Sequence, residues 1–275
     1  MVAGIIGLGL MGGSFALALR ELKLFDKIIG YDHNKEHQKS ALKLGLVDEI
    51  AEFDQIKKCD LIILAIPVEG IISVLQKLQD VKSDATIIDL GSTKEKIVNS
   101  VPQKIRKNFI AAHPMTGTEK FGPEAALPGL YKNKIVVLCD IEKSGKKQRS
   151  LAEDIFVNMQ MQIVYMDAHE HDKHAAFISH LPHAISYALA NSVMKQEDPQ
   201  SILILAAGGF KDMSRLAKSS PSMWTDIFKQ NRENLLTSIE VFEKELNYAK
   251  KLVEKREWDK LKEWMKNATT LHNIL

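Results

Sequence analysis

Hydrophobic residues in the first 167 positions form short continuous runs, separated by longer stretches in which they recur at helical spacing. Short apolar runs bounded by turn residues are typical of strands buried on both faces. The runs predict strands over residues 2–6, 27–31, 60–66, 86–90, 109–112, 135–139 and 162–165. The stretches between them predict helices over residues 14–24, 35–44, 69–78, 94–100 and 146–159. This alternation predicts an α/β fold with a doubly wound parallel sheet.

From residue 168 onward the pattern changes, because apolar residues recur only at helical spacing. The spacing predicts helices over residues 168–193, 199–207, 221–249 and 257–267. We therefore expect an α/β domain in residues 1–167 and an all-α domain in residues 168–275. A helical domain this small is expected to bury its apolar faces against a second copy of the chain, which predicts a homodimer.

Composition and charge narrow the class of protein. The chain has 275 residues, of which 45% are hydrophobic and 26% are charged, as in globular proteins. Its 37 basic residues nearly balance its 35 acidic residues, so the net charge of +2 favours neither nucleic acid nor a membrane surface as a partner. The sequence shows no secretory signal pattern and no apolar run near the roughly 20 residues of a membrane span. We expect a cytoplasmic protein in which Cys59 and Cys139 are buried, reduced thiols.

Five glycines crowd into the first thirteen residues, and three of them form a G-x-G-x-x-G motif. The motif lies between a predicted strand and a predicted helix, as in Rossmann-like dinucleotide-binding domains. Gly7 allows the tight turn, Gly9 lets a pyrophosphate approach the backbone, and Gly12 allows close packing of helix and strand. The free N–H groups and positive end of the helix favour an anion there. The motif predicts a cofactor site at Gly7, Gly9, Leu10, Met11 and Gly12.

An acidic residue follows at the end of the second predicted strand. Asp32 lies twenty residues after Gly12, where a carboxylate accepts hydrogen bonds from the ribose hydroxyls of a dinucleotide. A carboxylate repels a 2′-phosphate, and neither His33 nor Asn34 supplies the arginine that would bind one. The pattern therefore predicts NAD rather than NADP as cofactor. A glycine-rich turn without a ligand is the weaker interpretation.

Three later strands end in residues suited to chemistry. Pro67, Ser92 and His113 each follow a predicted strand, and the carboxyl ends of parallel strands lie at one edge of a sheet, where ligands bind. The reference pKa of histidine, about 6.5, suits removal of a proton from an alcohol during its oxidation. We expect His113 to act as this base; a histidine that is only hydrogen-bonded at a strand end is the alternative.

Five of the nine histidines lie between residues 169 and 183. His169, His171 and His174 lack the spacing of a known zinc motif, so we expect surface histidines near the domain junction and no metal. His180 and His183 lie in an apolar helical context, where burial beside a cleft and contact with a substrate are both open.

Arginine is scarce in this lysine-rich chain, which draws attention to Arg215. It follows Gly208 and Gly209, which predict a break between two apolar helices. A guanidinium binds a carboxylate through two parallel hydrogen bonds, so a substrate carboxylate is one candidate partner and a nearby surface acid is the other.

Taken together, the motifs resemble those of the prephenate dehydrogenase family, over essentially the whole chain. The resemblance rests on the glycine motif with Asp32, on Asp89-Leu90-Gly91-Ser92, on His113-Pro114-Met115-Thr116-Gly117-Thr118-Glu119, on His180-Leu181-Pro182-His183, and on Asp212-Met213-Ser214-Arg215 with Met223-Trp224. It implies NAD-dependent oxidative decarboxylation of prephenate to 4-hydroxyphenylpyruvate in tyrosine biosynthesis. Some family members carry a C-terminal regulatory domain, which we do not expect after Leu275.

The resemblance also implies roles for individual residues. His113 is expected to hydrogen-bond the ring hydroxyl of the substrate, with Ser92 oriented toward it, and Arg215 to hold a substrate carboxylate. Residues expected to line the substrate pocket or its entrance are His183, His180, Thr118, Glu119, Asp212 and Trp224. Pro67 and Ser92 are expected on the cofactor side.

Three other functions stay open at this point. The family includes enzymes that accept arogenate, in which an amine replaces the keto group of prephenate. A β-hydroxyacid or imine reductase shares the two-domain plan but needs a catalytic lysine, and Lys173 and Lys195 lack the expected surroundings. A dinucleotide sensor without catalysis would keep the glycine motif and lose the strand-end residues, whereas Ser92 and His113 are both present.

Overall fold

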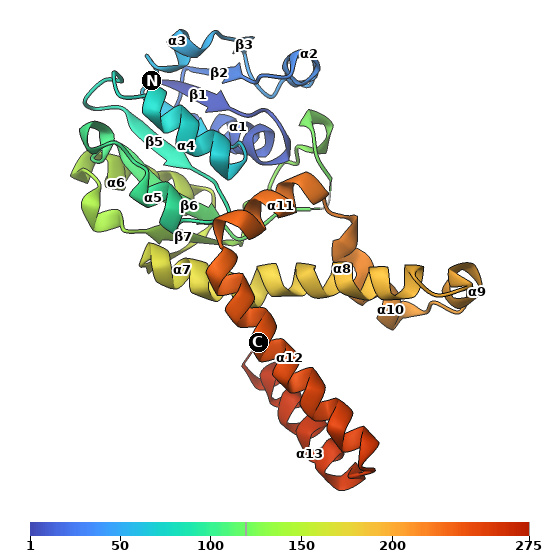
Figure 1. Ribbon diagram of the computed structural model, residues 1–275. Helices are drawn as coiled ribbons and strands as arrows, with labels where there is room; N and C mark the ends of the chain where they lie inside the picture. Colours follow the sequence, from blue (N-terminus) through green and yellow to red (C-terminus); the bar gives the residue numbers. More distant parts are fainter. Residues whose placement is uncertain (119, 275) are drawn as a thin grey trace. The chain divides into compact units, whose positions relative to one another are not determined.

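The computed structural model describes residues 1–118 and 120–274 and contains one eight-stranded sheet (Figure 1). The strands are β1 (Val2–Ile6), β2 (Lys27–Tyr31), β3 (Glu49–Ile50), β4 (Leu61–Leu64), β5 (Thr86–Asp89), β6 (Phe109–Pro114), β7 (Ile135–Cys139) and β8 (Gln162–Met166). Their order is β3-β2-β1-β4-β5-β6-β7-β8, and the order reverses at β1 and β4. All seven strands predicted from the apolar runs are present, which confirms the α/β fold.

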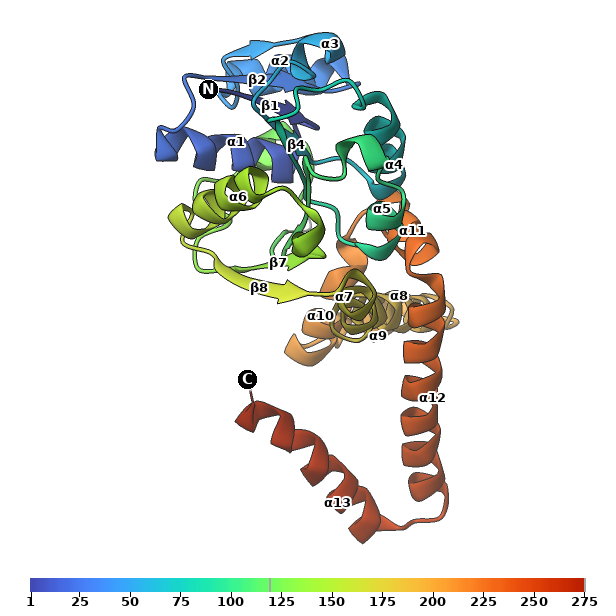
Figure 2. The same ribbon diagram turned by 90° about the vertical axis from the view of Figure 1, so that its left-hand side faces the viewer.

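Helices cover both faces of this sheet, so it is doubly wound as predicted (Figure 2). One face carries α1 (Leu10–Leu22), α2 (Lys35–Lys43) and α6 (Lys146–Asn158), and the other carries α3 (Phe53–Ile56), α4 (Val68–Lys77) and α5 (Glu95–Asn99). Successive strand residues face opposite layers: Ile63 packs with the first group and Ile62 with the second. Because both faces are buried, the strands read as continuous apolar runs.

One strand pair departs from the predicted parallel sheet. β7 runs antiparallel to β6, with His113 opposite Val137. A parallel neighbour needs a crossover of a dozen residues or more, usually a helix, whereas the segment between β6 and β7 contains only the short 3-10 turn η2 (Pro123–Ala125). The two-residue β3 and the one-turn α3 were not predicted, because elements so short carry no measurable periodicity.

The helical region continues from β8 through α7 (Ala168–Ala175), η4 (Ala176–His180), α8 (Leu181–Met194), α9 (Pro199–Ile204), α10 (Gly208–Ser214), η5 (Arg215–Lys218) and α11 (Pro221–Gln230). The single helix predicted over residues 168–193 is interrupted by η4, a turn of π-helix. Pro182 follows this turn. A proline has no N–H and its ring clashes with the carbonyl one turn earlier, so the wider π-turn relieves the conflict.

The break predicted at Gly208 and Gly209 is present: α9 ends at Ile204 and α10 begins at Gly208, so the two glycines open the second helix. One further expectation for the helical region was wrong. The helix predicted over residues 221–249 is broken at Asn231, which separates α11 from α12 (Arg232–Glu254).

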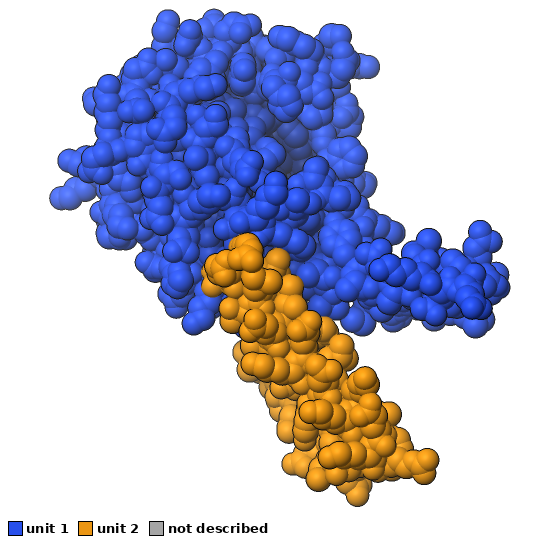
Figure 3. Space-filling view, in the orientation of Figure 1, with its two compact units in different colours: residues 1–231 blue, residues 232–275 orange. Residues whose placement is uncertain are grey.

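The chain forms two compact units, residues 1–231 and residues 232–275 (Figure 3). Within the second, α12 packs against α13 (Trp258–Thr269), and the Trp264 Nε1–H donates a hydrogen bond to Glu245 at 2.9 Å. The predicted boundary between residues 167 and 168 stays a prediction. In the part of the chain that the structure describes, no helix has the length and apolar character needed to span a membrane.

Candidate active site

The glycine motif forms a tight turn between β1 and α1 whose packing requires glycine. Gly7 has φ of +94°, and a Cβ on it would lie 2.3 Å from the Ala65 carbonyl oxygen. A Cβ on Gly12 would lie 1.9 Å from the Gly7 carbonyl oxygen. Gly9, which caps α1, is different, because the nearest atom to its Cβ position is 3.9 Å away. The space beside Gly9 and the free N–H groups of Leu10 and Met11 therefore fit an approaching pyrophosphate.

Two alanine substitutions should separate folding from cofactor binding at this turn. Gly12→Ala places a methyl group against backbone and should lower the unfolding midpoint by several degrees. Gly9→Ala meets only ordinary contacts, so the melting temperature should stay near that of the wild type while the KM for NAD rises about tenfold or more. Thermal unfolding and NAD titration measure the two effects. Equal losses of stability in both variants would contradict the assignment.

Asp32 lies at the end of β2 and is only 6% exposed. Its carboxylate accepts hydrogen bonds from the backbone N–H groups of Leu8 and Asn34, both at 2.9 Å. These bonds fix the carboxylate beside the glycine turn, where a ribose would lie. Nδ1 of His33 and Nδ1 of His37 lie 3.4 and 3.5 Å from its oxygens.

The segment after β6 crosses the start of α1. The Tyr131 hydroxyl donates to the Met11 carbonyl at 2.7 Å, and Ser14 Oγ accepts from the Leu127 N–H at 2.9 Å. These bonds hold the segment between β6 and β7 against the start of α1. Thr118 is exposed in this segment, and Glu119 lies outside the described residues.

His113 is near the end of β6 and is partly exposed. Its Nδ1 lies 2.8 Å from Nε2 of His171, and the two rings meet edge to face. Burial lowers the pKa of His113 well below 6.5, and the charges of His171 and Lys94 lower it further. His113 is therefore neutral at physiological pH, the form in which a histidine accepts a proton.

A fully buried ion pair stands behind His113. Lys94 and Asp89 are both 0% exposed and form a salt bridge. The Lys94 ammonium also donates to the Ala112 carbonyl at 2.8 Å, which ties the end of β5 to the residue before His113. Ser92 lies between Asp89 and Lys94 in the sequence, and Pro67 caps α4 after β4. Because β4, β5 and β6 are parallel neighbours, Pro67, Ser92 and His113 follow strands that end at the same edge of the sheet.

The helical region contributes a second group. His183 stacks on Trp224, with ring centroids 3.4 Å apart, and His180 meets the same indole edge-on. Burial lowers the pKa of His183, and the charge of Arg215 lowers it further, so the exposed guanidinium lies within electrostatic reach of this stack. Asp212 is exposed on α10. Among the described contacts, none joins Asp212 to the other predicted residues.

Acid should destabilise the folded protein through His180, which is 1% exposed. Burial lowers its pKa from 6.5 to about 4. Because the pKa of His180 is lower in the folded state than in the unfolded state, the unfolded state binds the proton first as the pH falls. The full stability is therefore present above pH 6.5 and is lost progressively toward pH 4. At roughly 1.4 kcal/mol per pKa unit, the loss at pH 4 is about 3 kcal/mol. His180→Gln should therefore lose less stability than wild type between pH 7 and 4 in thermal unfolding; equal losses would refute this.

Four residues of this arrangement were missed or misjudged from the sequence: Lys94, His171, Asp172 and Asn231. His171 was expected at the surface but is 3% exposed. The signal was available, because Ala168 and Ala175 flank it at helical spacing and place it on the buried face of α7. The Asn231 amide donates to the Asp172 carbonyl at 2.6 Å and lies 3.1 Å from His180 Nδ1, contacts that no sequence spacing encodes.

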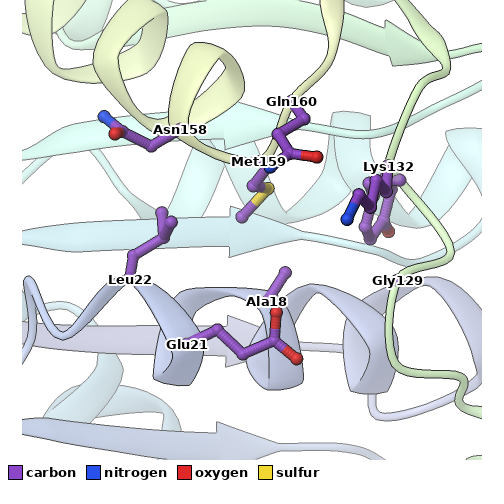
Figure 4. A pocket seen from close by; sticks show the side chains of 9 residues that line it. Ala18, Glu21, Leu22, Gly129, Lys132, Asn158, Met159 and Gln160 are labelled. Atoms are coloured by element: carbon purple, nitrogen blue, oxygen red, sulfur yellow. The ribbon is translucent and has the colours of Figure 1, made fainter.

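A small cavity of about 100 Å³ lies elsewhere, between α1, the end of α6 and the segment before β7 (Figure 4). Ala18, Glu21, Lys132 and Met159 are among its lining residues, and no predicted site residue lines it. This cavity does not belong to the candidate site.

Comparison with known proteins identifies the family. Residues 15–165 match the family model for the nucleotide-binding domain of prephenate dehydrogenase, and residues 167–267 match the model for its dimerization domain. The chain belongs to the prephenate dehydrogenase family. It is accordingly an NAD-dependent dehydrogenase, as predicted, and the assignment favours this interpretation over the reductase and sensor alternatives.

Relatives within the prephenate dehydrogenase family match along nearly the whole chain. A prephenate dehydrogenase of Bacillus subtilis is 33% identical over 96% of this chain and 73% of its own length. The structure of Aquifex aeolicus prephenate dehydrogenase in complex with hydroxyphenyl propionate and NAD+ superposes with a TM-score of 0.93 at 36% identity, covering 99% of this chain and 97% of the other. Synechocystis arogenate dehydrogenase gives a TM-score of 0.83 at 27% identity, with 99% of both chains covered.

Proposed function

We propose that this protein converts prephenate and NAD into 4-hydroxyphenylpyruvate, carbon dioxide and NADH, as a step of tyrosine biosynthesis. The observation that carries the proposal is the neutral His113, held by His171 at the carboxyl edge of the sheet, beside the glycine turn. NAD, when bound along Gly7, Gly9, Leu10, Met11, Gly12, Asp32, Pro67 and Ser92, supplies the hydride acceptor.

The reaction needs a base at one end of the substrate ring. His113 Nε2 accepts the proton of the ring hydroxyl as the hydride leaves the same carbon. The bond to the ring carboxylate then breaks, and its electron pair enters the ring, which becomes aromatic as carbon dioxide departs. The phenolate oxygen recovers a proton, so the reaction releases no net proton. Ser92 is the proposed partner that orients the hydroxyl toward His113.

The substrate also needs anchors for its two carboxylates. Arg215 is the proposed partner of one carboxylate, because a guanidinium binds it in bidentate fashion. His183, stacked on Trp224, lines the pocket beside Arg215, and His180 supports it from the buried side. Thr118, Glu119 and Asp212 are proposed for the pocket entrance.

NADH formation tests this function directly. Purified protein is mixed with NAD and prephenate, and the rise in absorbance at the NADH band is followed, with arogenate and with NADP as comparisons. We expect turnover with prephenate and NAD, and the carboxylate of Asp32 should make NADP the poorer cofactor. Absence of turnover with prephenate would overturn the proposal, and faster turnover with arogenate would reassign the substrate.

We also propose that the enzyme is a cytoplasmic homodimer with a helical substrate-binding and dimerisation domain from residue 168. The match to a dimerization domain supports the dimer, as does an apolar groove of about 330 Å³ lined by residues of α8, α9 and α10. Leu205 in this groove is 83% exposed. The buried, free thiols of Cys59 and Cys139 suit a reducing compartment.

A charge in the groove should dissociate this dimer. Leu205→Glu is expected to halve the mass measured by light scattering, because an ionised carboxylate resists burial in an apolar interface. Val157→Glu is the matched control, since Val157 is 60% exposed on α6 of the α/β region and should leave the mass unchanged. A monomeric wild type, or a dimeric Leu205→Glu, would contradict the proposal.

A further inference from the structure

Behind His113 lies a continuous chain of hydrogen bonds that ends at a buried carboxylate. His113 Nδ1 lies 2.8 Å from His171 Nε2, and His171 Nδ1 lies 2.8 Å from Asp172 Oδ1. His171 and Asp172 are 3% and 2% exposed. The chain thus leads away from the substrate side of His113 into the protein, on the buried face of α7.

The donors around Asp172 determine the direction of every bond in this chain. Its Oδ1 accepts from the Lys94 N–H at 2.7 Å and its Oδ2 from the Glu95 N–H at 3.0 Å, so the group is engaged as an acceptor at both oxygens. His171 Nδ1 must therefore donate to it, which leaves Nε2 of the neutral ring as an acceptor. His113 Nδ1 then donates to His171, and the lone pair of His113 lies on Nε2, which faces away from this chain.

We propose that His171 and Asp172 form a closed proton relay behind His113, taking one proton during the oxidation and returning it before product leaves. This inference rests on the proposed function for its substrate. His171 and Asp172 act through His113 and are positioning residues, whereas His113 is the group that touches the substrate.

The relay balances as two linked proton transfers. The ring hydroxyl gives its proton to His113 Nε2, while the Nδ1 proton of His113 passes to His171 Nε2. His171 is then an imidazolium, whose Nδ1–H stays bonded to the Asp172 carboxylate, and His113 is neutral again with its proton on Nε2. After decarboxylation both protons move back, and the phenolate oxygen recovers the proton it needs. Because the reaction releases no net proton, a relay that ends in a buried carboxylate suffices.

The charges around the relay favour this location for the proton. Lys94 lies close enough to oppose a positive charge on His113, and its own charge is neutralised by Asp89. His180, on η4, opposes a charge on His113 as well. Asp172 is bonded directly to His171, and none of the contacts of the described residues joins a carboxylate to His113, so the imidazolium is better placed at His171 than at His113.

Nitrogen NMR of the histidine rings tests the relay without any substrate. In the wild-type protein at pH 8, long-range ¹H–¹⁵N correlations should show His113 with its proton on Nδ1, the signals being assigned by their loss in His113→Asn. In His171→Leu, which removes the acceptor, the proton should redistribute toward Nε2. A wild-type His113 protonated on Nε2 would overturn the relay, as would an unchanged His113 in His171→Leu.

Kinetics of His171→Gln test the proton transfer itself. Glutamine can accept the His113 Nδ1–H bond but cannot take up a proton, so kcat should fall about 10- to 100-fold with both KM values within about twofold. Because glutamine keeps the hydrogen bond that positions His113, a merely structural role for His171 predicts a kcat near that of wild type. That result, or a rise in KM in place of the fall in kcat, would contradict the relay. His174→Gln is the matched control, an exposed histidine of the same helix that should leave kcat and both KM values unchanged.

The two arms separate failure of the relay from failure of the proposed function. A protein that shows the expected ring tautomers but does not turn over prephenate keeps the hydrogen-bond chain and loses the substrate assignment. Turnover of prephenate with an unchanged kcat in His171→Gln keeps the substrate assignment and removes the relay. If His171→Gln fails to fold, the wild-type tautomer at His113 still decides the direction of the chain.

Discussion

Replacing His113 with asparagine should lower kcat by about 10²- to 10⁴-fold while the KM for prephenate and for NAD changes little. Asparagine can still hydrogen-bond the ring hydroxyl, so binding survives, but its amide cannot accept the proton that must leave as the hydride departs. The loss should be visible in steady-state NADH formation at pH 7.5. Because His113 is partly exposed, the variant should unfold near the wild-type temperature.

The pH profile gives this prediction a second readout. Burial and the neighbouring charges lower the pKa of His113, so wild-type kcat/KM should stay high as the pH falls through 6.5 and decline only below it. In His113→Asn the remaining activity should lack this acid limb. A variant that keeps the acid limb, or that loses substrate affinity instead of kcat, would show that another group removes the proton.

The cofactor half of the site could be predicted from the sequence because its parts are local. The glycine turn, its flanking strand and helix, and Asp32 fall within one strand-helix-strand unit, where spacing along the chain determines position in space. The same holds for Ser92 and His113, since the ends of neighbouring parallel strands lie at one edge of the sheet. Their conformations follow from backbone sterics, as the φ of +94° at Gly7 shows.

The proton relay could not be predicted, because it depends on contacts between distant segments. His171 reaches His113 across 58 positions of sequence, and Asp172 reaches the Lys94 N–H across 78. His171 and its neighbouring histidines lack the spacing of a zinc motif, so the sequence pattern predicted a position at the surface. Ala168 and Ala175, however, indicate that His171 lies on the buried face of α7. The antiparallel direction of β7 has a related cause: strand direction depends on the preceding connection, which here contains no crossover helix.

Replacing Arg215 with alanine should raise the KM for prephenate about 50-fold and leave kcat and the KM for NAD nearly unchanged. A charged hydrogen bond to a carboxylate contributes about 2–3 kcal/mol, and loss of the bidentate pair leaves one substrate carboxylate without its partner. Arg215 is exposed at the start of η5, so the variant should fold normally.

Two companion variants sharpen the interpretation of Arg215→Ala. Arg215→Lys keeps the charge but loses the planar fork, so its KM should lie between those of wild type and Arg215→Ala. Lys218→Ala removes a positive charge from the same turn and should leave the KM within about twofold, which controls for the general field. If Lys218→Ala raised the KM for prephenate as much as Arg215→Ala does, Arg215 would act on the substrate only through its long-range charge and not through direct hydrogen bonds. A fall in kcat with unchanged KM would instead mean that Arg215 binds the transition state more strongly than the substrate, and its role would move from anchoring a carboxylate to the chemical step itself.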